Sequence, residues 1–369
     1  MRSLLPLLGL LSIVSAHAEL VMMGDGELSA VQGAGIGIVL EQVLVDAGQN
    51  TANQATITIN DITNASGQNV PISVKEFYLG ATGSNKGAIL NPVTIGRLNY
   101  PFKLNLAKGE ELRSLRDDGQ FVQTTPSNLA VLEFAFPERL AAGGNACVSG
   151  FAAAGSNCSS RASEKVDMGV RFDFNVVPGG RTDIINVDVT ALAMDGSYLR
   201  LWGDSARAQL VGEARLNIFA KTIDIMSCAA GTANCTSAAE QAARSIYLTN
   251  AYANVSLGYG KSQPLLLDVT SDGQFDLELP NPLTGATSAA ERNSRATDFY
   301  ANAPRTNIVI DNLNFGGTRV AGPVPSAGTV SGTGVYTAGP SPTTGGYNFG
   351  RNEISGMSFN YLKVTSHDL

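Results

Sequence analysis

Hydrophobic residues alternate with polar ones over much of the chain, which predicts β-strands. The clearest cases are 170–176 and 185–190, where aliphatic or aromatic residues take every second position. Shorter alternations occur at 54–62, 216–218, 223–225, 307–311 and 359–364. A period of two places one face of a strand in the interior and the other in water, which is typical of antiparallel sheets. The expected fold class is all-β, as a β-sandwich or a long curled antiparallel sheet with long loops rich in Gly, Ser and Pro.

Two other β architectures fit the chain less well. A β-solenoid should show a fixed short repeat, and none is visible. An outer-membrane barrel should show a regular series of ten-residue strands and many aromatic residues, whereas aromatic residues make up 7% of this chain.

Three segments pair an Asp-Gly dipeptide with an aromatic residue two positions after the Gly. They are 118–121, 195–198 and 272–275. Asp-Gly favours the positive φ values of a tight hairpin turn, and the aromatic residue then begins the returning strand. The alternative role as calcium ligands lacks the surrounding D-x-D-x-D-G series. Hairpin turns are therefore expected at all three.

Helices are expected at only two places, and two stretches are expected to be irregular. Residues 25–32 and 236–244 have the composition and capping residues of short helices. Residues 141–163 are rich in Ala, Gly and Ser, and 322–346 in Pro, Gly, Ser and Thr. The second stretch is expected to form a long surface loop between strands.

The N-terminus predicts export. Arg2 precedes a short apolar run, and Ala16-His17-Ala18 has the form of a signal-peptidase site. Residues 1–18 are therefore expected to be a signal peptide. No later run approaches the roughly 20 apolar residues of a transmembrane helix. The mature protein is expected in the periplasm, on the outer-membrane surface or outside the cell.

Five segments follow from these patterns. After the signal peptide come a helix–strand motif at 19–40 and a β region at 41–140. A loop carrying cysteines follows at 141–165, and a second β region at 166–369 contains the long loop.

The four cysteines form two local pairs, which suits an oxidising compartment. Four cysteines allow three connectivities, and loop closure favours neighbours. The expected disulfides therefore join Cys147 to Cys158 and Cys228 to Cys235. A metal site is less consistent, because the spacing is not C-x2-C and no His lies nearby.

Charge narrows the partners. The net charge is −7, and charged residues make up only 15% of the chain, against about a quarter in average proteins. An acidic chain has no electrostatic reason to bind nucleic acid or an anionic membrane.

Catalytic patterns are weak. His17 would leave with the signal peptide, and His367 lies three residues from the C-terminal end of the sequence. Residues 258–262 contain Gly-Lys-Ser, but the earlier Gly of a P-loop is replaced by Val255, and Pro264 prevents the following helix. This segment is expected to connect two strands. Acidic pairs at 110–111, 117–118 and 276–278 are more typical of wet strand faces and turns than of a glycosidase. No enzyme activity, cofactor or metal is expected.

Residues 23–38 carry a recognisable opening. Asp25, Leu28, Val31 and Gly33 fit the pattern D-x-x-L-x-x-V-x-G, followed here by Gly35. This resembles the opening of a poorly characterised family of exported, β-rich bacterial proteins labelled as pilus or filament assembly proteins. The resemblance implies a surface-structure role and supplies no catalytic residues.

Two functions remain open. The first is a surface-structure or filament-associated subunit, whose sheet edges and apolar faces meet envelope proteins or copies of itself. The apolar, glycine-spaced run 35–40 would suit strand addition to a neighbouring subunit. The second is a periplasmic or secreted binding protein for a hydrophobic or glycan ligand, with a site near Trp202, Tyr252 and Tyr259.

Overall fold

A computed structural model covers the chain. The residues that it describes are 34–47, 57–59, 66–68, 72–81, 92–95, 101–115, 121–137, 166–176, 183–190, 192, 194, 196–227, 238–271, 273–322, 329–330, 336–337 and 339–366. The proposed signal peptide, Asp25, Leu28, Val31, Gly33 and the four cysteines lie outside these residues, as does the helix expected at 25–32.

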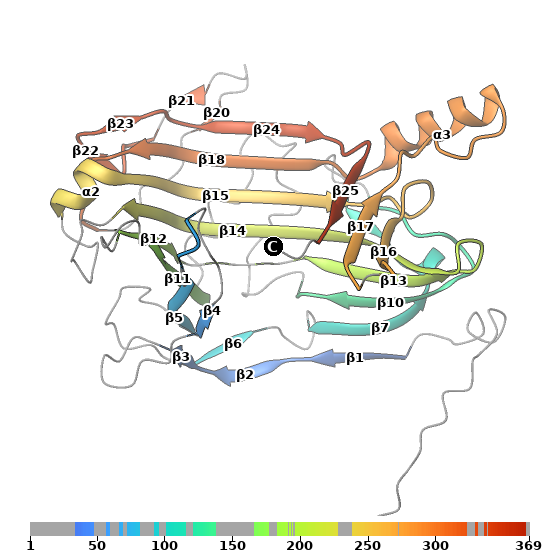
Figure 1. The fold of residues 1–369 in the computed structure, drawn as a ribbon, viewed down its shortest axis with the longest axis horizontal. Helices are drawn as coiled ribbons and strands as arrows, with labels where there is room; N and C mark the ends of the chain where they lie inside the picture. Colours follow the sequence, from blue (N-terminus) through green and yellow to red (C-terminus); the bar gives the residue numbers. More distant parts are fainter. Residues whose placement is uncertain are drawn as a thin grey trace, which may run out of the picture.

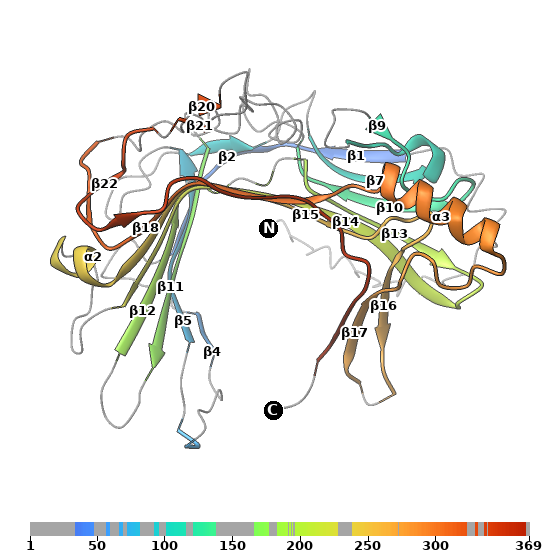
Figure 2. The same ribbon diagram turned by 90° about the horizontal axis from the view of Figure 1, so that it is seen from above.

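The expectation of an all-β fold is confirmed. Among the described residues, seventeen strands belong to one large antiparallel sheet, which curves into an arch when seen from above (Figures 1 and 2). Of the two forms expected, the described part of the chain therefore takes that of the long curled sheet.

One path of eight strands forms the roof of the arch (Figure 1). In hydrogen-bonded order it contains β1 (Ala34–Ile38), β7 (Phe102–Lys108), β10 (Ala130–Ala135), β13 (Tyr198–Asp204), β14 (Gln209–Ser227), β15 (Ser245–Leu257), β18 (Thr306–Phe315) and β24 (Asn352–Met357). β1 and β24 are thus the two edges of this roof.

Two further groups of strands branch from β14 and form the sides of the arch (Figure 2). One contains β12 (Asp183–Thr190), β11 (Val166–Val176), β5 (Ile72–Ala81), β4 (Ile57–Ile59) and β3 (Val45–Ala47). The other contains β16 (Leu265–Val269), β17 (Phe275–Leu279) and β25 (Leu362–Thr365). β23 (Tyr347–Asn348) pairs with the end of β18.

Four small two-stranded sheets complete the β structure. They pair β2 (Leu40–Val43) with β6 (Val93–Ile95), β8 (Ser114–Leu115) with β9 (Phe121–Val122), β19 (Thr318–Arg319) with β22 (Thr343–Thr344), and β20 (Thr329–Val330) with β21 (Tyr336–Thr337). β20, β21 and β22 fall within residues 322–346, which were expected to form a long loop.

The branching depends on the length of β14, which has 19 residues. On one edge, β13 pairs with residues 209–215 and β12 with residues 222–227. Ser197 spans the gap between them, because its Oγ accepts a hydrogen bond from the Asn217 N–H at 2.9 Å and donates to the Asn217 carbonyl at 3.2 Å. At the branch, the Ser197 side chain thus makes the hydrogen bonds to Asn217 that the backbone of a paired strand would otherwise make.

The expected hairpin at 195–198 is wrong. Gly196 has the positive φ of a turn, 66°, and Tyr198 begins β13 as expected. However, β12 and β13 pair with successive parts of β14 and not with each other. A strand as long as β14 offers backbone partners to both, which an isolated hairpin signal cannot reveal.

Other local predictions are confirmed. The turn at 272–275 joins β16 to β17, with Val269 opposite Phe275. Leu115 pairs with Phe121 across the first Asp-Gly, although that dipeptide itself lies outside the described residues. The alternating segments at 170–176, 185–190 and 307–311 lie in β11, β12 and β18, and those at 216–218 and 223–225 are parts of the single strand β14.

The helix expected at 236–244 is present as α2 (Ala238–Arg244), but α3 (Ala289–Asn302) was not anticipated. Its start carries a capping signal in Ser288-Ala-Ala-Glu291. The Ser288 hydroxyl accepts a hydrogen bond from the Glu291 N–H at 3.1 Å. The Glu291 carboxylate accepts one from the Thr287 N–H at 2.9 Å.

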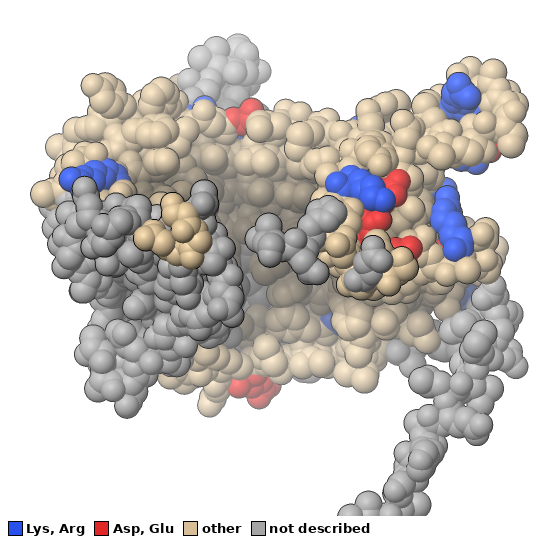
Figure 3. Space-filling model, viewed as in Figure 1, with Lys and Arg blue, Asp and Glu red and all other residues tan. Residues whose placement is uncertain are grey.

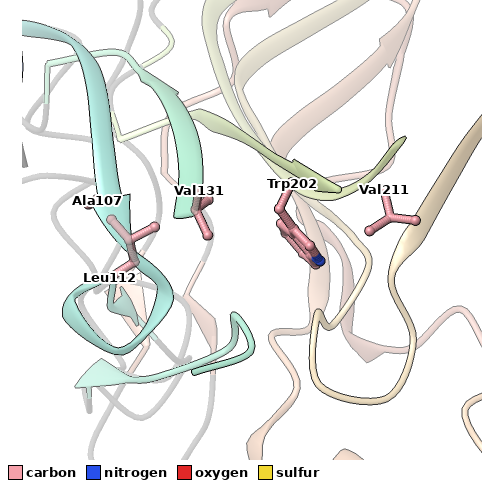
Figure 4. Packing of buried hydrophobic residues seen from close by; sticks show 5 residues of the cluster. All are labelled: Ala107, Leu112, Val131, Trp202 and Val211. Carbon is pink, nitrogen blue, oxygen red and sulfur yellow. The ribbon is translucent and has the colours of Figure 1, made fainter. Parts of the chain in front are cut away.

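A small apolar core lies beside β13. Ala107, Leu112, Val131, Trp202 and Val211 form a buried cluster (Figure 4). Leu129 and Leu266 pack against it from its margins. The cluster thus joins β7, β10, β13 and β14 to the turn that follows β7.

Gly212 permits β13 and β14 to approach each other. A Cβ at this position would lie 2.3 Å from the Arg200 carbonyl oxygen and 2.9 Å from Leu201 Cδ2. Gly203, on the neighbouring strand, has nothing within 4 Å of such a Cβ. We therefore expect Gly212→Ala to lower the free energy of unfolding by about 1–3 kcal/mol through overpacking.

Denaturant unfolding followed by Trp202 fluorescence would measure this change, and Gly203→Ala is the matched control. Equal stability of the two variants would contradict the close approach at Gly212.

Candidate functional site: the apolar face of the sheet

The roof of the arch has a polar face that is buried and an apolar face that is partly exposed. On β14, the buried residues Glu213, Arg215 and Asn217 alternate with Ala214, Leu216 and Ile218, which are only half-buried. The neighbouring strands β15 and β18 show the same arrangement. This reverses the usual placement of aliphatic residues inside and charged residues outside.

The half-buried aliphatic residues form continuous cross-strand rows. Directly opposed residues in antiparallel strands share one face of the sheet. The rows run Ile218–Ala253–Ile308–Ile354, Val189–Ile223–Leu248–Leu313 and Val187–Ile225–Ile246–Phe315–Tyr347. We call this surface the apolar face.

A fourth row carries the apolar face to the edge of the roof. It runs Ile36–Leu104–Phe134–Leu199–Ala214–Leu257 across six strands. Ile36 is 60% exposed and Phe134 is 44% exposed. An exposed apolar surface that runs across six strands is typical of a surface that binds a partner.

The apolar face lines the inside of the arch. The polar face is covered by the β8–β9 hairpin and by β19 and β22, and Figure 2 shows β9 and β22 on the outer side. Figure 3 looks into the inside and shows a hollow whose floor is almost entirely free of Lys, Arg, Asp and Glu, while charged residues gather at its rim.

A buried ionic network supports the polar face. Arg200 donates from Nε to Glu133 at 2.9 Å and from Nη1 to Glu213 at 2.9 Å. Glu213 also accepts hydrogen bonds from the Thr124 hydroxyl at 2.7 Å and the Gly260 N–H at 3.2 Å. Burial opposes the charge of Arg200, but the neighbouring acidic groups, chiefly Tyr198 and Glu213, raise its pKa overall. Arg200 therefore keeps its positive charge.

Amide and hydroxyl side chains continue the polar face along the sheet. Asn217, Asn254 and Asn307 face one another across three strands and are all buried. Asn307 also accepts a hydrogen bond from the Gly356 N–H at 2.8 Å. At the far end Arg319 donates from Nε and Nη2 to the two oxygens of the Asp224 carboxylate, and its guanidinium stacks 4.0 Å over the Tyr247 ring.

The alternation changes phase along a line across the roof. Asn250 has a φ of 46°, a left-handed conformation that Asn tolerates. Before it, odd-numbered residues of β15 face the buried side, and after it even-numbered residues do. On β18 the same change occurs at Asp311 and Asn312, both buried. The phase change keeps the polar residues on one face over the full length of the strands.

The aromatic residues near which a ligand site was expected are buried, although Trp202 also borders a hollow of about 390 Å³. Trp202, Tyr252 and Tyr259 are 4%, 3% and 0% exposed. Trp202 belongs to the apolar core, and the Tyr259 hydroxyl donates to Asp298 at 2.8 Å beneath Phe299. These residues fill the interior, and this prediction of a site is corrected.

The other sequence candidates have structural roles. The turn at 258–262 joins β15 to β16 as expected, and no helix follows it before β16. Asp276 and Glu278 lie on β17 beside Lys363, whose Nζ is 2.8 Å and 4.0 Å from their carboxylates. The hydrogen bond from Lys363 lowers the pKa of Asp276. Gly35 lies in β1.

Within the described residues, no group of His, Cys, Asp and Glu is arranged to hold a metal ion. Two hollows of about 440 and 390 Å³ lie beside the polar face. Arg200 and Arg215 border the first, and Lys261 and Arg295 the second. The apolar face is thus the most extensive candidate site.

Glu213 should be more important for stability than its single charge suggests. Glu213→Gln removes the carboxylate from a buried arginine and leaves the ionic network incomplete, so we expect a loss of about 3–5 kcal/mol. Arg207→Ala breaks the more exposed pair with Asp204, and we expect a loss below about 1 kcal/mol.

Denaturant unfolding of the two variants would test this difference. Similar losses for both would mean that Glu213 is not held in a dry network.

Tyr247 should make stability fall at high pH. Burial, followed by the charge of Asp224, raises the pKa of Tyr247 from 10.0 to about 12. Its proton is held more tightly in the folded state, so its contribution is complete below pH 10 and is lost as the pH rises towards 12. At about pH 11 the loss should be roughly 1 kcal/mol.

Unfolding measured at pH 9 and at pH 11 would show a smaller difference in Tyr247→Phe than in the unaltered protein. An identical pH dependence in both proteins would contradict the buried placement of the phenol.

None of the described helices is both long and apolar enough to cross a membrane. Comparison with protein-family models, curated proteins and solved structures yields no match to this chain.

Proposed function

We propose that the protein is a non-catalytic, exported subunit of a bacterial surface structure, which associates with like subunits through the apolar face and the sheet edges that bound it. The observation that carries this proposal is the orientation of the sheet. Its charged residues are paired within the molecule, and its aliphatic rows are left partly exposed.

The energetics favour association on the apolar side. Burying apolar surface contributes about 25 cal/mol per Å², and one fully buried Ile or Leu about 1.5–3 kcal/mol. The polar side offers less, because Arg200, Glu133 and Glu213 already satisfy one another.

Export is supported by the signal-like residues 1–18, and a surface role by the resemblance of residues 23–38 to filament-associated proteins. The two local cysteine pairs suit an oxidising compartment.

A second candidate function is the binding of a hydrophobic ligand inside the arch. The uncharged floor of the hollow favours it (Figure 3). A glycan ligand receives less support, since Trp202, Tyr252 and Tyr259, near which the site was expected, are buried.

Ile354 offers a direct test of association. It is 52% exposed and lies opposite Ile308 on the apolar face. If the contact covers the apolar face at β24, Ile354→Asp should weaken self-association by at least about tenfold, because a charge would have to be desolvated there. A contact confined to the opposite edge, at β1, would leave the association of this variant unchanged. Val320→Asp is the control, since Val320 is 45% exposed but lies beyond β19, on the side of the polar face.

Light scattering coupled to size exclusion, over a range of protein concentrations, would measure the association. A monomer at every concentration would refute the proposal. An apolar compound found by mass spectrometry in such a monomer would support the ligand-binding alternative.

A further inference from the structure

Strand β1 has one neighbouring strand among the described residues, β7. It pairs with β7 from Ala34 opposite Leu106 to Ile38 opposite Phe102. In the described part of the chain, no strand pairs with the other side of β1. Among the described residues, nothing pairs with the N–H and C=O groups on that side, which is the arrangement that another strand can add to.

β1 also lacks the features that usually block edge pairing. Residues 34–40 contain no charged residue and no Pro. Natural proteins commonly place a charge or a Pro on an exposed edge to prevent association. β24, the opposite edge of the roof, carries Glu353, which pairs with Arg351 at 3.1 Å. β3 carries Asp46, and β25 carries Lys363.

The two faces of β1 differ in a way that fits a joint between subunits. Ile36 and Ile38 are 60% and 45% exposed, and Ile36 ends a row of the apolar face. Gly35 and Gly37 face the other way. There a Cβ would lie 3.0 Å from Asn105 Oδ1 and 2.9 Å from Pro101 Cγ. The glycines thus keep β1 close against β7.

We propose that β1 pairs antiparallel with β1 of a second copy of this chain, with Ile36 opposite Ile36 and Ala34 opposite Ile38. This inference rests on the proposed function and names the edge that carries out the association. β24 carries a charged residue, and the uncharged edge strands β4 and β23 have only three and two residues, against five in β1. The longest uncharged edge among the described strands is therefore β1, which is paired here with β1 of another copy. A two-fold axis makes the contact self-complementary and closed.

The register keeps the apolar residues together. Even-numbered residues face even-numbered residues, so Ile36 and Ile38 of both copies lie on the same side. The apolar faces of the two copies then become continuous across the joint. Because both strands are uncharged, no like charges oppose each other.

A cysteine at position 36 tests the register. Opposed Cβ atoms in such a pair lie about 4.5–5.5 Å apart, which is within reach of a disulfide after a small backbone movement. On mild oxidation Ile36→Cys should form a dimer that reductant releases. Ile38→Cys should not, since the two copies of residue 38 would be roughly 13 Å apart along the strands.

The unaltered protein and Val269→Cys are the controls. The first accounts for the natural cysteines, and the second places a thiol at a 65% exposed site on β16. Three results would each overturn the proposal. They are disulfide-linked oligomers of Ile36→Cys larger than a dimer, cross-linking of Ile38→Cys to the same extent as Ile36→Cys, and cross-linking to a different protein.

Light scattering separates this inference from the proposed function. Ile36→Lys should weaken dimer formation by at least about tenfold, because a lysine on an edge must be desolvated on pairing. Val269→Lys should leave dimer formation unchanged. Association that Ile354→Asp weakens but Ile36→Lys does not would overturn the role of β1 and leave the proposed function standing. A protein that is monomeric throughout would overturn both.

Discussion

The structure depends on the burial of charged and amide side chains on one face of a single sheet. Glu213 on β14 accepts hydrogen bonds from Arg200, Thr124 and Gly260, and its side chain is almost completely buried. Charges removed from water must be paired and hydrogen-bonded, or the sheet would not form. The β8–β9 hairpin and the turn after β15 supply part of this second layer. Ordering these two segments costs conformational entropy, and the hydrogen bonds that they make to the buried polar side chains of the sheet offset this cost.

That constraint fixes where the aliphatic residues lie. Side chains on a strand alternate strictly, so a buried polar face leaves the other face to Ile, Leu and Val. The phase change at Asn250 preserves this separation through the middle of the sheet. β14 extends this separation of the two faces to the sides of the arch. Its 19 residues pair with β12, β13, β15 and β16, and both sides of the arch are attached through these strands. The apolar inner surface is therefore a consequence of the polar outer layer.

The sequence revealed the strands better than their faces. A period of two identified 170–176, 185–190 and 307–311, but it does not say which set of alternating residues is buried. The usual assumption places aliphatic residues inside, and here Ile218 is more exposed than Asn217. The partners of Asn217 lie in β15 and β18, far along the chain, and Glu213 meets Thr124 across 89 positions.

Local signals were sufficient for α2. The capping residues Ser288 and Glu291 could have revealed α3. Trp202 was expected at a ligand site because aromatic residues often mark one, but its contacts with Val131 and Val211 place it in the core.

The curvature of the sheet limits how two copies can meet. Two concave faces touch only at their rims, so the floor of one arch cannot pack flat against the floor of another (Figure 2). Association that uses the apolar face must therefore run along the edges that bound it. β24 presents Glu353 at its edge, whereas β1 presents Ile36 and Ile38 and has no charged side chain. Joining at β1 extends the inner surface from one copy into the next and keeps its aliphatic rows on the inside. The same geometry that prevents face-to-face packing thus makes the β1 edge the natural point of contact, and the enlarged inner surface would shelter more apolar area than either copy can alone.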